Sequence, residues 1–206
     1  MYLSAHGLGV RLGGHWIFRA VDFVLGPHDR WVVVGPSGQG KSTLLRCLAG
    51  VMTPTGGRVM MAPKRTCGWM AQSDLLLPWK TVRQNVRLNR ALAVRAPDEE
   101  QVEEALVALG LEEQGEFFPG QLSQGMRQRV ALARTLLQGS DIVLLDEPCA
   151  ALDLATRERA LHWILEEQKR RGFGLMMVTH QEEDRHMVHA RVMRLNQESV
   201  REEALS

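Results

Sequence analysis

The sequence has few cysteines, almost no net charge and no long apolar run, and each absence excludes a class of protein. The three cysteines, Cys47, Cys67 and Cys149, are widely spaced and form no C-x-x-C pair. This spacing argues against a zinc site or a disulfide framework and favours a reducing compartment. A net charge of +1 over 206 residues gives no reason to expect nucleic acid or an anionic membrane surface as a partner.

Signals for targeting or membrane insertion are missing as well. The first ten residues do not resemble a signal peptide. No apolar run approaches the roughly 18 residues of a membrane-spanning helix, and no segment repeats. With 45% apolar and 24% charged residues, the sequence predicts one soluble domain that is large enough to bury a core. Contact with a membrane would then pass through a partner.

What is present is a phosphate-binding loop. The segment GPSGQGKST fits G-x-x-x-x-G-K-[ST], follows the apolar run 31–34 and precedes a helical pattern over 44–49. Glycines let backbone N–H groups turn toward an anion, and the next helix directs its positive end to the same point. Lys41 would reach the β- and γ-phosphates, and Ser42 would bind Mg²⁺. The loop comprises Gly35, Pro36, Ser37, Gly38, Gln39, Gly40, Lys41, Ser42 and Thr43.

Strand and helix patterns alternate along most of the chain. Alternating strands and helices predict a parallel sheet with right-handed crossovers, and helical periodicity over about 81–138 indicates an inserted lobe. In the last long helix, 153–171, we expect Leu154, Leu161, Ile164 and Leu165 to point inward. The expected strands are 2–8, 16–25, 30–34, 58–61, 65–70, 141–145, 173–179 and 191–195. The other expected helices are 44–49, a helix capped by Asp98 and ending before Gly110, and one from Ser123 to Gly139.

Two acids follow a second apolar strand. Ligands of parallel sheets bind beyond the carboxyl ends of the strands, so Asp146 should lie near the Mg²⁺ at Ser42. Glu147, one residue further, is placed to orient or deprotonate an attacking water. Without the phosphate loop, the same pattern would be an ordinary strand followed by a polar turn at Pro148.

A third motif, Leu122–Arg129, begins the second helix of the lobe. Ser123 is a good helix N-cap, and one interpretation is that the motif only caps the helix. A Ser-x-Gly at a helix N-terminus also presents donors suited to a γ-phosphate. Because Ser123 and Gly125 are far in sequence from Lys41, these donors could serve the nucleotide of another copy.

Taken together, these motifs resemble the nucleotide-binding subunit of ATP-binding cassette (ABC) transporters over nearly the whole chain. The resemblance implies an α/β fold: a P-loop NTPase (RecA-like) core, residues 1–76 and 136–206, with an N-terminal antiparallel β portion and an inserted α-helical signature lobe, residues 77–135, in a single domain. It implies ATP and Mg²⁺ as cofactors. The motif matches are Gly35–Thr43 (Walker A), Gln72 (Q-loop, Mg²⁺ and water), Leu122–Met126 (signature), Asp146 (Walker B), Glu147 (catalytic glutamate), Asp153 (D-loop) and His180 (switch histidine).

The chain departs from the family pattern at several positions. The signature usually reads LSGGQ, but Gln124 and Met126 replace its first glycine and its glutamine; Ala150 replaces the usual D-loop serine. Leu12 stands at the position where family members usually have the aromatic residue that stacks on adenine. Trp16 is nearby, although we expect it to pack in the sheet. Base stacking should therefore be weak.

The resemblance also implies an assembly. Ser123 and Gly125 of one chain would complete the site of a second copy, or of a paralogous ATPase subunit, in a head-to-tail dimer closed by ATP. The dimer would sit on the cytoplasmic side of the inner membrane, bound peripherally to transmembrane permease subunits and serving a solute-binding protein indirectly. The apolar stretch Gln72–Trp79 is where we expect the permease to dock, although Leu75–Leu77 could instead pack the lobe.

The motif 76–86, LLPWKTVRQNV, resembles importer subunits for nitrate, sulfonate or taurine, which favours import of a small anion. Three alternatives stay open. The chain could energise an exporter or release system, act as an ABC ATPase without a permease, or be a regulatory cassette that binds ATP without turnover. The last is disfavoured by intact Lys41, Asp146, Glu147 and His180.

Overall fold

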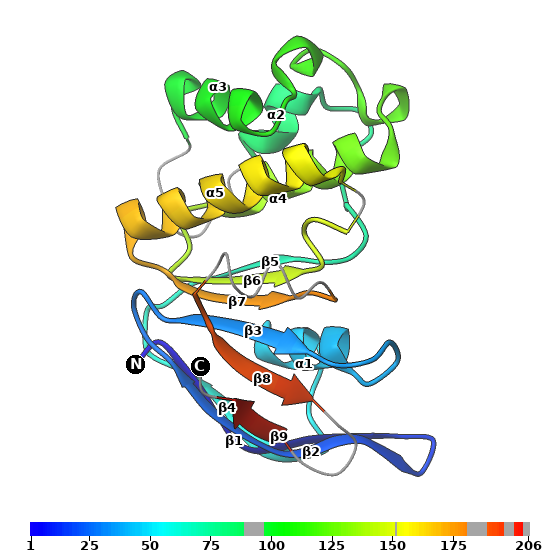
Figure 1. Cartoon of the computed structure of the whole chain (residues 1–206), viewed down its shortest axis with the longest axis vertical. Coiled ribbons are helices and arrows are strands. Elements are labelled where there is room, and N and C mark those ends of the chain that lie inside the picture. Colours follow the sequence, from blue (N-terminus) through cyan, green and yellow to red (C-terminus); the bar gives the residue numbers. More distant parts are fainter. Residues whose placement is uncertain (89–96, 151, 181–188, 196–199, 204–206) are drawn as a thin grey trace.

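Two sheets form the centre of the protein. In the computed structural model, residues 1–88, 97–150, 152–180, 189–195 and 200–203 are described. An antiparallel sheet has the order β2-β1-β4, and a six-stranded sheet has the order β5-β6-β7-β3-β8-β9, in which only β9 runs antiparallel to its neighbour (Figure 1). The strands are β1 (Leu3–Leu12), β2 (His15–Leu25), β3 (Arg30–Val34), β4 (Gly56–Met61), β5 (Cys67–Met70), β6 (Ile142–Asp146), β7 (Gly174–Val178), β8 (Arg191–Leu195) and β9 (Val200–Glu203).

Helices lie on both sides of the parallel strands. Helix α1 lies between the two sheets, while α4 and α5 cover the opposite face and α2 and α3 form the layer beyond them (Figure 1). The helices are α1 (Lys41–Leu48), α2 (Val82–Val86), α3 (Glu99–Ala108), α4 (Gln124–Leu137) and α5 (Leu154–Arg171), with 3₁₀ turns at Glu112–Gln114 and Pro119–Gln121. This is the predicted α/β fold with an antiparallel portion and a helical insertion; the residue limits of the core and the lobe stay a prediction.

The parallel strands are buried on both faces because their side chains alternate between two cores. In β3, Val32 and Val34 join the core beneath α4 and α5, whereas Trp31 and Val33 join the core that contains α1 and the antiparallel sheet. All five residues of β6 and all five of β7 are buried. Near-continuous apolar strands of this kind are what a sheet covered on both faces requires.

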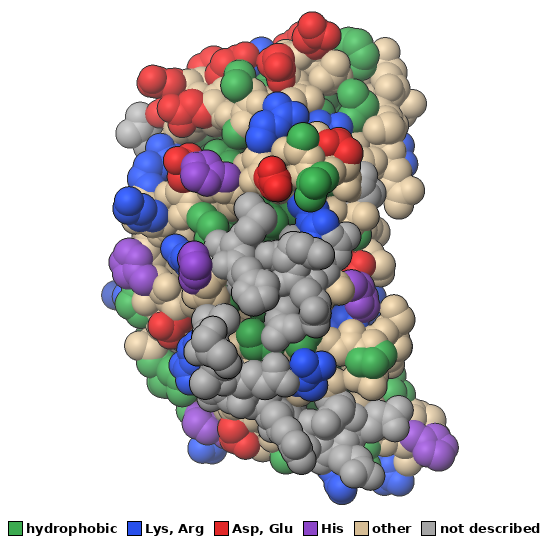
Figure 2. Space-filling view, in the orientation of Figure 1, with side chains coloured by type: hydrophobic (Ala, Val, Ile, Leu, Met, Phe, Trp, Pro, Cys, Tyr) green, Lys and Arg blue, Asp and Glu red, His purple; other side chains and the backbone are tan. Residues whose placement is uncertain are grey.

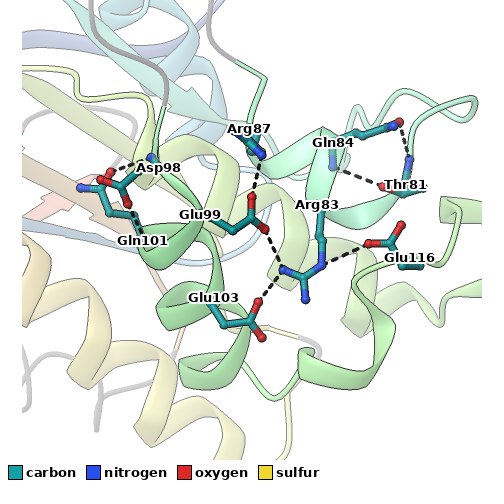
Figure 3. A network of polar contacts seen from close by, with 9 residues as sticks. All are labelled: Thr81, Arg83, Gln84, Arg87, Asp98, Glu99, Gln101, Glu103 and Glu116. Carbon is teal, nitrogen blue, oxygen red and sulfur yellow. Dashed lines mark hydrogen bonds and ion pairs between the residues drawn. The ribbon is translucent and has the colours of Figure 1, made fainter.

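Helix caps and ion pairs define the helical lobe. Thr81 caps α2 and Asp98 caps α3, each with a reciprocal bond from a glutamine three residues later. Arg83 forms ion pairs with Glu99, Glu103 and Glu116, so α2 is joined to α3 and to the following turn (Figure 3). Acidic side chains gather over the α3 end of the molecule (Figure 2).

Several sequence expectations need correction. Leu154 is 65% exposed, because Thr156 and Arg157 form the buried face of the first turn of α5. Leu161 and Ile164 are fully buried as expected, and Leu165 is only partly buried. Strand β1 continues to Leu12 rather than ending at residue 8, because irregular pairing with β2 extends it. Helix α1 begins at Lys41, three residues before its apolar pattern.

Candidate nucleotide-binding site

The phosphate loop connects β3 to α1 and passes close to β2. Gly40 has φ 85°, and a Cβ there would lie 2.3 Å from Cγ2 of Ile17. Both the left-handed backbone and the close approach therefore require glycine. The loop reaches α1 through this residue, which places Lys41, Ser42 and Thr43 in the first turn of the helix.

Lys41 folds back over the loop. Its Nζ donates to the carbonyl oxygens of Gly35 at 2.8 Å and Pro36 at 2.9 Å, and the residue is only 5% exposed. Burial lowers the pKa of Lys41, and the nearby Glu147 and Asp146 partly oppose this shift. A buried ammonium with two neutral acceptors is poorly compensated, so an anion at this position would improve its environment.

Ser42 and Asp146 meet as predicted. The Ser42 hydroxyl donates to Oδ1 of Asp146 at 3.1 Å, and Asp146 is 2% exposed at the end of β6. Burial raises the pKa of Asp146; the Ser42 bond opposes the shift, and Glu147 adds to it. A hydroxyl and a buried carboxylate are hard oxygen donors of the kind that Mg²⁺ prefers. These residues fit an Mg²⁺ ion, which would relieve the carboxylate's burial.

Glu147 and His180 form a pair at the ends of neighbouring strands. Nε2 of His180 lies 2.7 Å from Oε1 of Glu147. Glu147 follows β6 with φ 53°, a left-handed conformation that is uncommon for a residue with a side chain. Its backbone N–H donates to the carbonyl of Val178, the last residue of β7, at 3.1 Å. Strain of this type persists where the surroundings enforce it, and it clusters at active sites.

A cavity of about 360 Å³ is lined by Lys41, Ser42, Glu147 and His180, but not by Asp146, which binds the Ser42 hydroxyl. It brings together, from separate parts of the sequence, most of the side chains that the motifs single out. Gly35, Pro36 and Gln39 belong to the loop but are not among the described residues that line the cavity. The lining residues are Leu12, Ile17, Ser37, Gly38, Gly40, Lys41, Ser42, Thr43, Gln72, Glu147 and His180.

The part of the cavity contributed by β1 and β2 is apolar. Leu12 and Ile17 line this part of the cavity. Leu12, at the position where the family usually has an aromatic residue, is 49% exposed. Trp16 is not a lining residue, and its ring lies against Gly9 of β1 and Gly56 of β4. A Cβ added at Gly9 would be 2.9 Å from the Trp16 ring, and one added at Gly56 would be 3.7 Å from it. The expectation that Trp16 packs on the sheet is therefore confirmed. Ile17 was not anticipated, and only its strand alternation with Trp16 could have indicated it.

Three further predicted site residues, Ser123, Gly125 and Asp153, are not among the residues that line this cavity. Ser123 caps α4, its Oγ accepting from the N–H of Met126 at 3.2 Å, and Gly125 lies in the first turn of that helix. Asp153 caps α5 and accepts the N–H of Thr156 at 3.0 Å, a bond that lowers the pKa of Asp153. Of the D-loop stretch 150–153, Ala151 lies outside the described residues. In the described part of the chain, Ser123, Gly125 and Asp153 thus lie outside the cavity that the phosphate loop lines.

The segment after Gln72 is partly exposed. Leu75 is 62% and Trp79 is 70% exposed, whereas Leu76 packs against the core. Some apolar residues of this stretch therefore pack against the core and others face outward, and docking of a permease here stays a prediction. Among the helices that the structure describes, none is both long and apolar enough to cross a bilayer.

Sequence reasoning missed a polar link beside Gln72. Arg127 of α4 forms an ion pair with Asp74, Nε to Oδ2 at 3.0 Å. Arg134, two turns later on the same helix, donates to the carbonyl oxygens of Asp74 at 2.7 Å and Leu75 at 2.8 Å. The seven-residue spacing of the two arginines was the available signal, because it places both on one helix face.

A phosphate loop between a buried strand and a helix, facing acids at the end of another strand of the same parallel sheet, defines a P-loop nucleotide-binding protein. The family described as "ABC transporter" matches residues 18–150. This match covers more than half of the chain, and the protein belongs to the ABC transporter family.

Curated relatives and solved structures agree with this assignment. The chain is 42% identical over 184 residues to the aliphatic sulfonates import ATP-binding protein SsuB 2 of Xanthomonas axonopodis pv. citri (strain 306), covering 86% of this chain and 62% of that protein. It is 41% identical to the taurine import ATP-binding protein TauB of Pseudomonas aeruginosa (strain UCBPP-PA14), covering 80% and 65%. The chain thus spans less than two thirds of either relative. The ATP-binding cassette MJ0796, in a dimeric post-hydrolysis state with ADP and Pi, superposes with a TM-score of 0.87 at 26% identity, covering 99% of both chains.

Proposed function

We propose that this chain is the ATP-hydrolysing subunit of an importer for a small organosulfonate-like anion. The observation that carries the proposal is the single cavity that contains Lys41, Ser42, Gln72, Glu147 and His180. The named functions of the sulfonate and taurine relatives support import and suggest the solute class.

The residues of the cavity have distinct roles in this proposal. Lys41 leaves the carbonyls of Gly35 and Pro36 and binds the β- and γ-phosphates, while the loop N–H groups and the start of α1 hold the remaining charge. Glu147 accepts a proton from the attacking water, and His180, paired with Glu147, contacts the γ-phosphate. Gln72 orients that water from another wall of the cavity.

Mg²⁺ is the proposed second cofactor. Ser42 and Asp146 would hold it, with Gln72 as a further oxygen donor. When bound, the ion neutralises phosphate charge as transfer proceeds. The raised pKa of Asp146 means that the ionised carboxylate is disfavoured without a cation, which supports a cation as its natural neighbour.

The site is incomplete in one chain. Ser123 and Gly125 begin α4 away from the cavity, where the helix N-terminus offers backbone N–H groups for a phosphate. We propose that they contact the γ-phosphate held by a partner ATPase subunit in a head-to-tail dimer, with Asp153 at the same interface. The dimeric state of cassette MJ0796 supports this arrangement.

The proposed membrane partner is a permease, with this subunit bound to it on the cytoplasmic side. Leu75 and Trp79 supply exposed apolar side chains next to Gln72, which fits a groove for a short permease helix. The net charge of +1 gives no independent reason for direct lipid binding.

The proposal is tested by ATP turnover of the purified chain beside Glu147→Gln, with size-exclusion chromatography in Mg²⁺–ATP. We expect the unchanged chain to hydrolyse ATP, and the variant to lose turnover by about 100-fold or more while eluting as an ATP-dependent dimer. Full activity from a strictly monomeric preparation would contradict the composite site. Co-purification with permease subunits, lost in Leu75→Asp but retained in the equally exposed control Val51→Asp (63% exposed), tests the partner.

A further inference from the structure

Two arginines of helix α4 bind the segment that follows Gln72. Arg127 pairs with the Asp74 carboxylate, and Arg134 donates to the carbonyls of Asp74 and Leu75. The stretch from Gln72 to Leu75 is thereby fixed at its far end by two guanidinium groups of one helix. Neither arginine lines the nucleotide cavity, and so ligand contact does not account for them.

The same helix also carries Ser123. Arg127 donates through Nη1 to the carbonyl of Leu122 at 2.8 Å, while its Nε holds Asp74. Leu122 immediately precedes Ser123, the N-cap of α4. One side chain therefore spans the start of the signature helix and the segment after Gln72. A planar group with several fixed donors, as in arginine and not in lysine, suits this double contact.

The backbone that these arginines bind is strained at Leu75. Leu75 has φ 49°, in the left-handed region that non-glycine residues rarely occupy. Such a conformation persists where surrounding contacts over-determine it. The Asp74 side chain adds a local bond by accepting the N–H of Leu76 at 3.2 Å, and Arg134 satisfies the Leu75 carbonyl. The stretch therefore has one well-defined arrangement relative to α4.

We propose that Arg127 and Arg134 are positioning residues that make Gln72 and Ser123 move as one unit. Gln72 contacts the nucleotide held by its own chain, whereas Ser123 serves the nucleotide of the partner subunit. The two arginines thus link the two halves of the composite site through α4. This inference rests on the proposed function, because it needs ATP at the cavity and a role for Ser123.

The test is hydrogen exchange of the full chain with and without Mg²⁺–AMP-PNP, at a protein concentration at which it is monomeric. We expect the analogue to slow exchange in 35–43 and to change exchange in 122–128. In Arg127→Gln the response at 35–43 persists, whereas that at 122–128 falls by about fivefold. Arg127→Lys, which keeps the charge but cannot hold both acceptors, gives an intermediate response, and Arg134→Gln behaves like Arg127→Gln.

The matched control is Arg65→Gln, which removes the Arg65–Asp141 ion pair of 2.7 Å, formed by two residues outside α4 and outside the Gln72–Leu75 stretch. It should leave both responses unchanged. Equal responses at 122–128 in the unchanged chain and in Arg127→Gln would overturn the inference, as would a response at 35–43 with none at 122–128. No response at 35–43 in the unchanged chain would instead contradict nucleotide binding itself, and with it the proposed function.

Discussion

Charged groups in the nucleotide cavity and in the helical lobe have opposite electrostatic situations. Burial lowers the pKa of Lys41, which lines the cavity, and raises that of Asp146, which binds the Ser42 hydroxyl, so each group is pushed away from its charged form. In the lobe, the hydrogen bond from Arg83 to Glu103 raises the pKa of Arg83, which favours its charged form. Burial thus disfavours the charged forms at the nucleotide site, whereas in the lobe hydrogen bonding favours the charged form of Arg83, whose ion pairs join α2 to α3.

This comparison predicts that Lys41→Met separates binding from stability. The variant should lose about 100-fold or more in ATP affinity, because the ammonium has no replacement opposite the phosphates. Its free energy of unfolding without nucleotide should not fall and should rise by up to about 1 kcal/mol, since a poorly compensated buried charge is removed. Calorimetric titration with ATP and chemical denaturation measure the two effects. A large loss of stability in the empty state would contradict the view of Lys41 as a destabilising charge.

Asp146→Asn should weaken Mg²⁺–ATP binding by about tenfold while stabilising the empty protein. The sign of the pH dependence follows from the raised pKa of Asp146. Below the pKa of an unfolded carboxyl both states are neutral and the side chain matches an amide. As pH rises from there through the raised pKa of the folded state, the unfolded chain ionises first and the folded protein loses stability. The midpoint of thermal unfolding of the Asp146→Asn variant should therefore exceed that of the unchanged protein by a margin that widens toward neutral pH. A constant margin from about pH 4 to about pH 7 would show that the carboxylate is not the cause.

In the lobe the expectation reverses. Arg83→Ala should reduce the free energy of unfolding by about 1 kcal/mol, because it breaks a network of partly exposed ion pairs to Glu99, Glu103 and Glu116 (Figure 3). ATP affinity should not change, since Arg83 does not line the cavity. High salt should shrink the difference between the two proteins. Arg87→Ala, which removes a single pair with Glu99, serves as the smaller control.

The cavity was more predictable from sequence than the lobe, for physical reasons. The phosphate loop is contiguous, so its glycines and Lys41 declare their roles locally. Asp146 could be placed beside Ser42 although 104 residues separate them, because strand ends in a parallel sheet meet at one edge. Arg127 and Asp74, 53 residues apart, follow from no such rule, since the pairing depends on how α4 packs.

Apolar periodicity gave a wrong prediction of burial for Leu154, at the start of α5. Leu154 has the right spacing to point inward, but Thr156 and Arg157 form the buried face of the first turn of α5 and Leu154 is exposed. The caps were predicted more reliably, since Asp98 and Ser123 both accept backbone N–H groups at the starts of their helices. Capping is decided by three neighbouring residues, whereas burial is decided by the whole fold.

The smallest predicted effect concerns the apolar end of the cavity. Leu12, at the position where the family usually has the aromatic residue that stacks on adenine, lines the cavity together with Ile17, and aliphatic side chains lack the flat π-face that makes such stacking favourable. Leu12→Tyr should therefore tighten ATP binding by about threefold. Val24→Tyr, at a comparably exposed position of β2 outside the cavity (44% against 49%), is the matched control. Because both variants add an exposed tyrosine to the antiparallel sheet, a gain in affinity in Leu12→Tyr alone identifies the base-binding position; an equal gain in both, or in neither, means that the base does not lie over Leu12.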